Sequence, residues 1–295
     1  MNDHDSIHAF AFQDFGVRGK LVHLNASWQA VVANKAYPEP IRLLLGEALA
    51  ASVLLASTLK FDGKLTLQLQ TERALSLLLT QCTSDFHLRG LAHWHEDRLD
   101  DDPRRLFDQG RLALTLEPSG EGQRYQGIVP LEQTTLAGCV EDYFAASEQL
   151  PTRLWFAASA DQIVGMLLQQ MPREGGRQTS RADDDGWPRV QMLADTITRD
   201  ELLQLSDLDI LHRLFHEENV RLFSSSPVSF RCTCSQARIR NMLRGLGQAE
   251  VDSIIAEQGV VSVDCEFCGR SYTLDAIDAA HLFVDEAVNL SDQKH

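Results

Sequence analysis

Two stretches, Cys232-Thr233-Cys234 and Cys265-Glu266-Phe267-Cys268-Gly269, decide how the C-terminal part of this chain folds. Together they bring four thiols in two close pairs, and a tetrahedral Zn²⁺ takes four such ligands at about 2.3 Å. A small module rarely stabilises itself without a metal or a disulfide. We therefore expect Cys232, Cys234, Cys265 and Cys268 to bind one zinc ion. The alternative, four unligated cysteines in a core, leaves the paired spacing unexplained.

The cysteines belong to a predicted zinc-binding module of residues 228–295. Ser235 is the predicted N-cap of a helix that ends at Gly247, and a second helix ends at Gly259. Apolar residues alternate with polar ones on both sides of the Cys265–Cys268 pair, which predicts a β-hairpin with this pair in its turn. The module is thus expected to hold two helices and a cysteine-bearing hairpin.

The close spacing of the thiols also suits redox chemistry. Both a C-x-C and a C-x-x-C pair are close enough for a local disulfide, and metal-bound cysteines meet an oxidant as thiolates. Structural zinc contributes about 10–16 kcal/mol, whereas a whole domain is stable by only about 5–15 kcal/mol. Loss of the metal should therefore unfold the module, as in a peroxide-operated switch. From spacing alone, a purely structural zinc site stays equally open.

Residues 1–175 show the pattern of an α+β domain with mostly antiparallel sheets. Apolar residues all round the stretch 41–60, which follows Pro38 and Pro40, predict a buried helix. A second helix is expected over 134–149, ending before Pro151. Strands are predicted near 65–70, 112–116, 123–129, 153–157 and 162–171, and they come in hairpin-like pairs.

A linker is predicted between the two domains, over residues 176–227. Residues 173–186 have no apolar period, and residues 181–220 hold 4 basic and 10 acidic side chains. Thr198-x-x-Glu201 and Ser206-x-x-Asp209 each resemble a capping box in front of an apolar stripe. Short helices are marginal alone, so we expect an acidic, metastable helical segment.

Composition and charge exclude several functional classes. The chain has 295 residues, and 27 basic against 42 acidic side chains give a net charge of −15, the wrong sign for a nucleic-acid partner. The start of the chain lacks the pattern of a signal peptide. The apolar stretch Leu43–Leu59 is interrupted by Glu47 and is expected to be too short for a membrane span of about 20 residues. We therefore expect a cytoplasmic protein that binds neither nucleic acid nor membranes.

Phe230-x-Cys232-x-Cys234-Ser235 and Cys265-x-Phe267-Cys268-Gly269-x-x-Tyr272 resemble the C-terminal signature of the redox-regulated heat-shock holdase chaperones, the 33 kDa chaperonin family. Leu274 stands where this family usually has an aromatic residue. The resemblance extends along nearly the whole chain, through Val17-Arg18-Gly19, Tyr37-Pro38-x-Pro40, Leu45-Gly46-Glu47, Tyr125-Gln126-Gly127, Asp142-Tyr143-Phe144-x-x-Ser147-Glu148-Gln149-Leu150-Pro151-Thr152 and Gly165-Met166-Leu167-Leu168-Gln169-x-Met171-Pro172.

This resemblance implies a stress-response chaperone that is not an enzyme. Its reduced, zinc-bound form would be an inactive monomer. Oxidation would form the disulfides Cys232–Cys234 and Cys265–Cys268, release zinc, unfold the adjacent linker and favour a homodimer. The oxidised form would hold unfolding or oxidatively damaged client proteins without ATP. In agreement, the sequence lacks nucleotide-binding and serine-hydrolase motifs.

Two other functions and two weaker signals remain in the sequence. A zinc-ribbon binding module for nucleic acid is disfavoured, because residues 231–275 hold 5 basic and 6 acidic side chains. A thiol–disulfide oxidoreductase would carry Cys265-x-x-Cys268 at a helix N-terminus, not in a hairpin. His93 and His95 lack further ligands for a second metal site. Cys82 and Cys139 are expected to be buried as small apolar residues.

Overall fold

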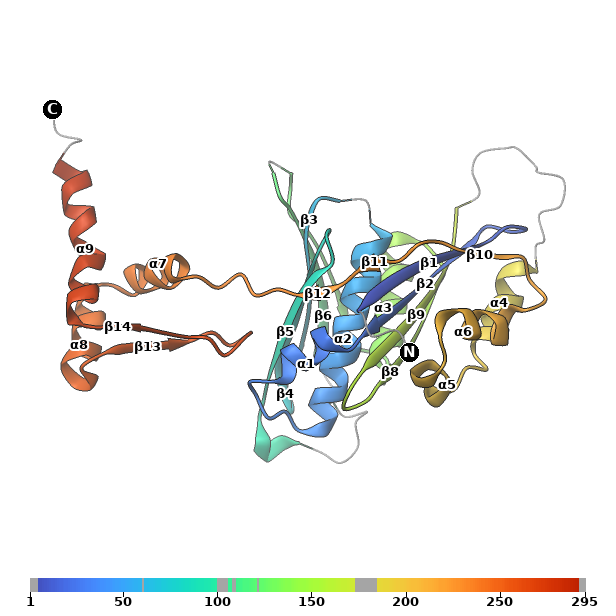
Figure 1. Cartoon of the computed structure of the whole chain (residues 1–295), viewed down its shortest axis with the longest axis horizontal. Helices are drawn as coiled ribbons and strands as arrows, with labels where there is room; N and C mark the ends of the chain where they lie inside the picture. The colour runs from blue at the N-terminus through green and yellow to red at the C-terminus, as the bar shows by residue number, and fades with distance from the viewer. Residues whose placement is uncertain are drawn as a thin grey trace. The chain divides into compact units, whose positions relative to one another are not determined.

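The computed structural model describes residues 5–59, 61–99, 106–107, 110–120, 122–172 and 185–291, with side chains described up to Phe283. Its contacts divide the chain into two compact units, Met1–Arg231 and Cys232–His295 (Figure 1). The predicted division into three parts, at 175 and 227, stays a prediction. Most of the predicted break at 173–186 lies outside the described residues.

Two antiparallel sheets form the frame of the N-terminal unit, as predicted for an α+β domain. Every strand pair is antiparallel except that of β12 with β5, which is parallel. The first sheet has the order β10-β1-β2-β9-β8, with β11 also paired to β1, and the second has the order β12-β5-β4-β3-β6-β7. The strands are β1 Ser6–Phe12, β2 Val17–Leu24, β3 Gly63–Thr71, β4 Leu75–Thr83, β5 His87–Trp94, β6 Gly110–Pro118, β7 Tyr125–Pro130, β8 Thr152–Ala158, β9 Ile163–Gln170, β10 Val220–Leu222, β11 Ser226–Pro227 and β12 Ser229–Phe230.

Helix α2, Glu39–Thr58, lies between the two sheets and is the centre of the main core (Figure 1). Pro40 in its first turn and its many fully buried leucines confirm the predicted buried helix. The expectation that this stretch is too short to span a membrane was wrong, because α2 has 20 residues and a mean hydropathy of 1.6 over an 18-residue window. In the fold, 72% of that window is buried, as expected for a core helix.

Shorter helical elements complete the edges of this core. Helix α1, Ala26–Val32, lies between β2 and α2, and the 3₁₀ turn η1, Glu96–Arg98, lies between β5 and β6. The predicted helix over 134–149 is α3, Leu136–Tyr143, followed by a single π-helical stretch η3, Phe144–Glu148. Thr135 caps α3 by accepting a hydrogen bond from the Gly138 N–H at 3.2 Å. Gln149, with a φ of 53°, ends the helical segment shortly before the predicted stop.

Three short helices cover the outer face of the first sheet: α4 Gly186–Ala194, α5 Arg199–Gln204 and α6 Asp207–Phe215. The capping box between Thr198 and Glu201 is present as predicted. At Ser206 only half of the predicted box forms, because the hydroxyl accepts the Asp209 N–H while the Asp209 carboxylate accepts the Ser206 hydroxyl. A second core joins helices and sheet; its buried members are Phe10, Phe12, Val17, Leu21, Ala157, Val164, Met166, Leu168, Val190, Ala194, Leu202, Ile210, Leu211, Leu214 and Phe215.

A buried polar contact at the start of α6 adds to this packing. Asp207 is only 4% exposed, and its two carboxylate oxygens each face a histidine of the sheet. His23 Nε2 lies 2.5 Å from Oδ1 and His8 Nδ1 lies 2.5 Å from Oδ2. A buried carboxylate is costly unless it is paired. These two histidines therefore help to hold α6 against β1 and β2.

The C-terminal unit contains the two predicted helices, α7 Gln236–Leu246 and α8 Gln248–Gln258, and the predicted hairpin, β13 Val261–Asp264 with β14 Ser271–Leu274. A third helix, α9 Ala276–Ser291, follows and was not predicted. The core of this unit is small and includes Leu274. Its buried residues are Leu243, Val251, Val261, Leu274, Ala279 and Leu282.

Candidate metal centre

Two different kinds of backbone present the four cysteines. Cys232 and Cys234 lie in an extended segment just before α7, where the Ser235 side chain caps the helix by accepting the Arg238 N–H. Cys265 and Cys268 lie in the turn between β13 and β14. Within the turn, the Cys268 and Gly269 N–H groups both donate to the Cys265 carbonyl. Gly269 has a φ of 66°, a left-handed conformation that favours glycine.

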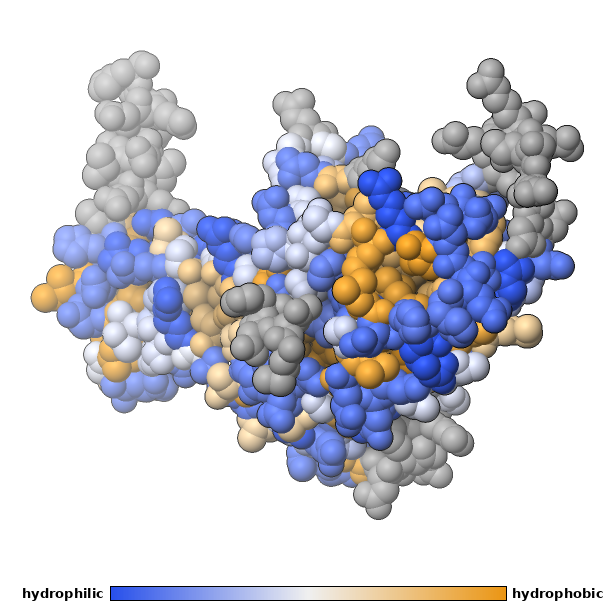
Figure 2. All heavy atoms as spheres, turned by 45° about the vertical axis from the view of Figure 1, so that its right-hand side comes forward, coloured by the Kyte–Doolittle hydropathy of each residue, from blue (hydrophilic) through white to orange (hydrophobic). Residues whose placement is uncertain are grey.

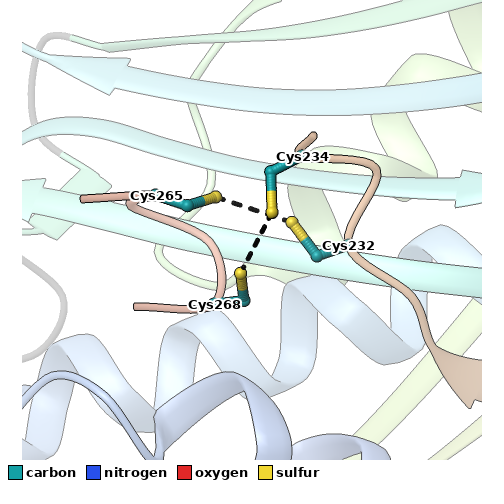
Figure 3. A group of neighbouring side chains, drawn as sticks. All are labelled: Cys232, Cys234, Cys265 and Cys268. Carbon is teal, nitrogen blue, oxygen red and sulfur yellow. Dashed lines mark hydrogen bonds between the residues drawn. The ribbon is translucent and has the colours of Figure 1, made fainter. Parts of the chain in front are cut away.

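The four sulfur atoms point toward one another and lie within 4.8 Å of one another (Figure 3). Cys232 Sγ is 3.5 Å from Cys265 Sγ, and Cys234 Sγ is 3.4 Å from Cys268 Sγ. In a tetrahedral zinc site with Zn–S bonds of about 2.3 Å, the sulfurs are about 3.8 Å apart. The arrangement of this chain therefore fits a zinc ion bound by four thiolates. All four cysteines are half-buried, and none forms a disulfide.

The hydrogen bonds around the sulfurs favour a thiolate at one position. The Tyr272 hydroxyl donates to Cys234 Sγ at 3.1 Å. Although burial raises the pKa of Cys234, hydrogen bonds from Tyr272 and from the other cysteines lower the pKa to about 7. Burial, together with the hydrogen bonds to neighbouring cysteines, raises the pKa of Cys268 to about 12. A metal ion would hold all four as thiolates and so remove this inequality.

Tyr272 and Arg238 support the site, and the sequence analysis did not assign either of them this role. Arg238 Nη1 donates to the Thr233 hydroxyl at 2.6 Å, which orders the residue between the first two cysteines. Tyr272 belongs to β14 and was noted only as part of the alternation and of the family motif. One sequence feature could have predicted that Tyr272 contacts a sulfur atom: it stands four residues beyond Cys268, on the strand that follows the turn.

The geometry does not select one pairing of the thiols. The two shortest recorded sulfur contacts join a cysteine before α7 to a cysteine of the hairpin. However, all the sulfurs lie within 4.8 Å, so any of the pairings needs only a small movement. The predicted disulfides Cys232–Cys234 and Cys265–Cys268 stay a prediction.

The other sequence signals do not form a second site in the described part of the chain. There, the four cysteines are the one group of three or more His, Cys, Asp or Glu residues with ligand atoms close enough for a metal. His93 is on β5 and His95 follows that strand. Cys82 and Cys139 are buried as expected, and burial raises their pKa values to about 12 and about 11. The Cys265-x-x-Cys268 pair lies in a hairpin turn, not at a helix N-terminus.

Fold and site together define an α+β protein with a C-terminal four-cysteine module. The same fold is found in a solved structure described as a 33 kDa chaperonin (heat shock protein 33 homolog) from Thermotoga maritima. The two align with a TM-score of 0.81 and 20% identity, covering 96% of this chain and 99% of the other.

A family model described as Hsp33 protein matches residues 5–275. Two relatives, both named 33 kDa chaperonin, come from Nitrosococcus oceani and Ectopseudomonas mendocina. The first is 46% identical over 286 residues, covering 97% of this chain and 96% of the relative, and the second is 47% identical, covering 96% of each. This chain therefore belongs to the Hsp33 protein family. Membership supports a chaperone role, and the relatives carry the name of chaperonins and not of enzymes.

Proposed function

We propose that this chain is a redox-regulated, ATP-independent holdase of the cytoplasm. Its reduced form binds one zinc ion through Cys232, Cys234, Cys265 and Cys268 and is an inactive monomer. Oxidation forms the disulfides Cys232–Cys234 and Cys265–Cys268, releases zinc and unfolds the helical linker. The oxidised homodimer then binds unfolding or oxidatively damaged proteins and prevents their aggregation.

The observation that carries this proposal is the cluster of four half-buried sulfurs within 4.8 Å in a unit with a small core. When bound, zinc supplies a crosslink among these thiolates. Each thiol pair can pass two electrons and two protons to one molecule of H₂O₂, which yields one disulfide and two molecules of water. A disulfide sulfur is a poor zinc ligand, because the thiolate is the form that binds metal. Oxidation therefore removes the ligands on which the unit depends.

The helices α4, α5 and α6 support the second half of the proposal. They are short, and their burial against the first sheet supplies most of their stability. Their release would expose the apolar faces of both layers, including Phe10 and Phe12 on β1 and Leu214 and Phe215 on α6. Such exposed apolar surface binds other apolar chains without an energy source.

The test is to follow zinc, thiols and holdase activity in one preparation. We expect peroxide with mild heat to release about one zinc ion and consume four thiols per chain. Light scattering should then show that a denatured client no longer aggregates, and that reduction reverses this effect. A C82A/C139A variant is the matched control, since it removes only the two thiols outside the cluster. Zinc that stays bound, or equal suppression by reduced and oxidised protein, would refute the proposal.

A further inference from the structure

Strand β7 is an edge of the second sheet and pairs only with β6 among the described strands. The Leu131 N–H donates to the Gly110 carbonyl at 2.9 Å. In an antiparallel pair, residues whose backbone groups face the neighbouring strand alternate with residues whose groups face away. With this register, Gln126 and Ile128 point their backbone N–H and carbonyl groups away from β6. No described residue hydrogen-bonds to these groups.

The strands at the other sheet edges are either very short or partly satisfied by side chains. Strands β10, β11 and β12 have three, two and two residues. On β8, the Glu141 carboxylate accepts the Leu154 N–H at 2.8 Å, and the Arg199 guanidinium donates to the Ala158 carbonyl. Proteins protect their edges in such ways, because an open edge can pair with another extended chain. Among the described edges, β7 is therefore the longest one that stays open.

The sequence of β7 also lacks protection by charge. None of its six residues is charged, and the Tyr125 and Ile128 side chains are 45% and 57% exposed. Tyr143 of α3 packs against Gly127, where an added Cβ would lie 2.6 Å from the tyrosine ring, and this contact holds the strand in place. The open stretch ends at Pro130, which has no N–H. The edge is therefore short, uncharged and firmly supported.

We propose that the β7 edge binds extended, uncharged segments of unfolded proteins by adding them to the second sheet as a further strand. The backbone groups of Gln126 and Ile128 bind the backbone of the segment, which is the part that all unfolded proteins share. Side chains of the segment lie beside the exposed Ile128, where β-branched and aromatic neighbours are favoured. The edge therefore selects extended conformation more than sequence.

This site goes beyond the proposed function, because its availability does not depend on oxidation. Helices α4, α5 and α6 pack on the first sheet, so the β7 edge is open whether they are docked or melted. A single short edge binds weakly, and weak binding alone does not prevent aggregation. We therefore expect the reduced protein to bind extended peptides without acting as a holdase.

Two labelled peptides test the inference on the reduced, full-length protein. The first is a short peptide of alternating threonine and valine, and its twin carries a methyl group on every inner amide nitrogen. The first peptide should bind at least about tenfold more tightly than its twin in fluorescence anisotropy. It should also shift the amide NMR signals of Gln126 and Ile128. Apolar side chains gather in a hollow on the face that Figure 2 shows, and such a surface would bind both peptides alike.

Two variants at one position separate the backbone from the side chain. Ile128→Pro removes an outward N–H without removing a hydrogen bond to β6, whereas Ile128→Thr keeps this N–H on a β-branched residue. We expect binding of the first peptide to fall at least about fivefold in Ile128→Pro and to stay unchanged in Ile128→Thr. Urea unfolding checks that both variants keep the sheet, and the NMR shifts of the wild type need no variant.

Equal binding of the two peptides, or NMR shifts confined to residues outside β7, would overturn the inference. Equal binding of the first peptide by both folded variants would do so too. Dimers of the reduced protein that Ile128→Pro abolishes in sedimentation would assign the edge to a second copy and not to unfolded segments. Because every measurement uses the reduced protein, a failure of oxidation to activate the holdase would refute the proposed function and leave this inference standing.

Discussion

Replacing Glu47 by glutamine should make the N-terminal unit more stable at alkaline pH and change little at acidic pH. The pKa of Glu47 is raised from 4.5 to about 7 in the fold, so its protonated form favours folding. This contribution is complete below pH 4.5 and is lost as the pH rises through 7. The two pKa values correspond to a loss of about 2–3 kcal/mol between pH 5 and pH 8.

Urea unfolding of the reduced protein at several pH values measures this effect. The free energy of unfolding of the wild type, minus that of Glu47→Gln, should fall by about 2–3 kcal/mol from pH 5 to pH 8. Most of the fall should occur between pH 5 and pH 7. Glu39→Gln removes a charge from the exposed first turn of α2 and controls for the loss of charge alone.

A difference that stays constant across this range would refute the reasoning, because it would show that Glu47 is not desolvated in the fold. A difference with the opposite slope would mean that a cation pairs with Glu47 in the reduced protein.

Three further predictions concern the metal, a close contact and the start of α6. A zinc chelator added to the reduced protein should abolish amide protection in α7 and α8 and leave α2 protected, as hydrogen exchange by mass spectrometry would show. Gly19→Ala should destabilise the N-terminal unit by about 1–3 kcal/mol in urea unfolding, because the new Cβ would lie 2.0 Å from the Phe10 ring. Asp207→Asn should weaken the contact with His8 and His23 by about 1–3 kcal/mol. Amide hydrogen exchange in α6 should then accelerate at least about fivefold, with no change in α8. Unchanged exchange in α6 would contradict the role of Asp207 in holding this helix against β1 and β2.

Local patterns were enough to predict the elements whose signals are strong. The apolar stretch after Pro38 predicts α2, and the alternation of apolar and polar residues around Leu67 predicts β3. In each case the buried residues recur with the period of the element. Ser235 marks the start of α7, and Gly247 and Gly259 mark the ends of α7 and α8. These ends could be predicted because serine and glycine are favoured residue types at such cap positions. The spacing of the cysteines and the family resemblance predicted the four-cysteine cluster that the structure shows.

Other features depend on distant partners, and the sequence does not show them locally. The strands β10, β11 and β12 have three, two and two residues, and each exists only because β1 or β5 offers an edge. Glu47 was noted as an interruption of an apolar run and as part of a family motif, but not as a buried carboxyl, because its neighbour Arg199 lies far along the chain. Likewise, Asp207 shows no sign in the sequence of its two histidine partners.

Contacts to the β1–β2 hairpin lie on both sides of helices α4, α5 and α6 along the chain. On the N-terminal side of these helices, Met171 donates its N–H to the Gly16 carbonyl at 2.8 Å, and on their C-terminal side Val220 pairs with Phe12. If α4–α6 melt, Met171 and Val220 can still hold the chain to the β1–β2 hairpin on both sides of these helices. A loop loses less entropy on reordering than a free tail, because its ends are already together. We therefore expect α4–α6 to refold faster than they would as a free tail.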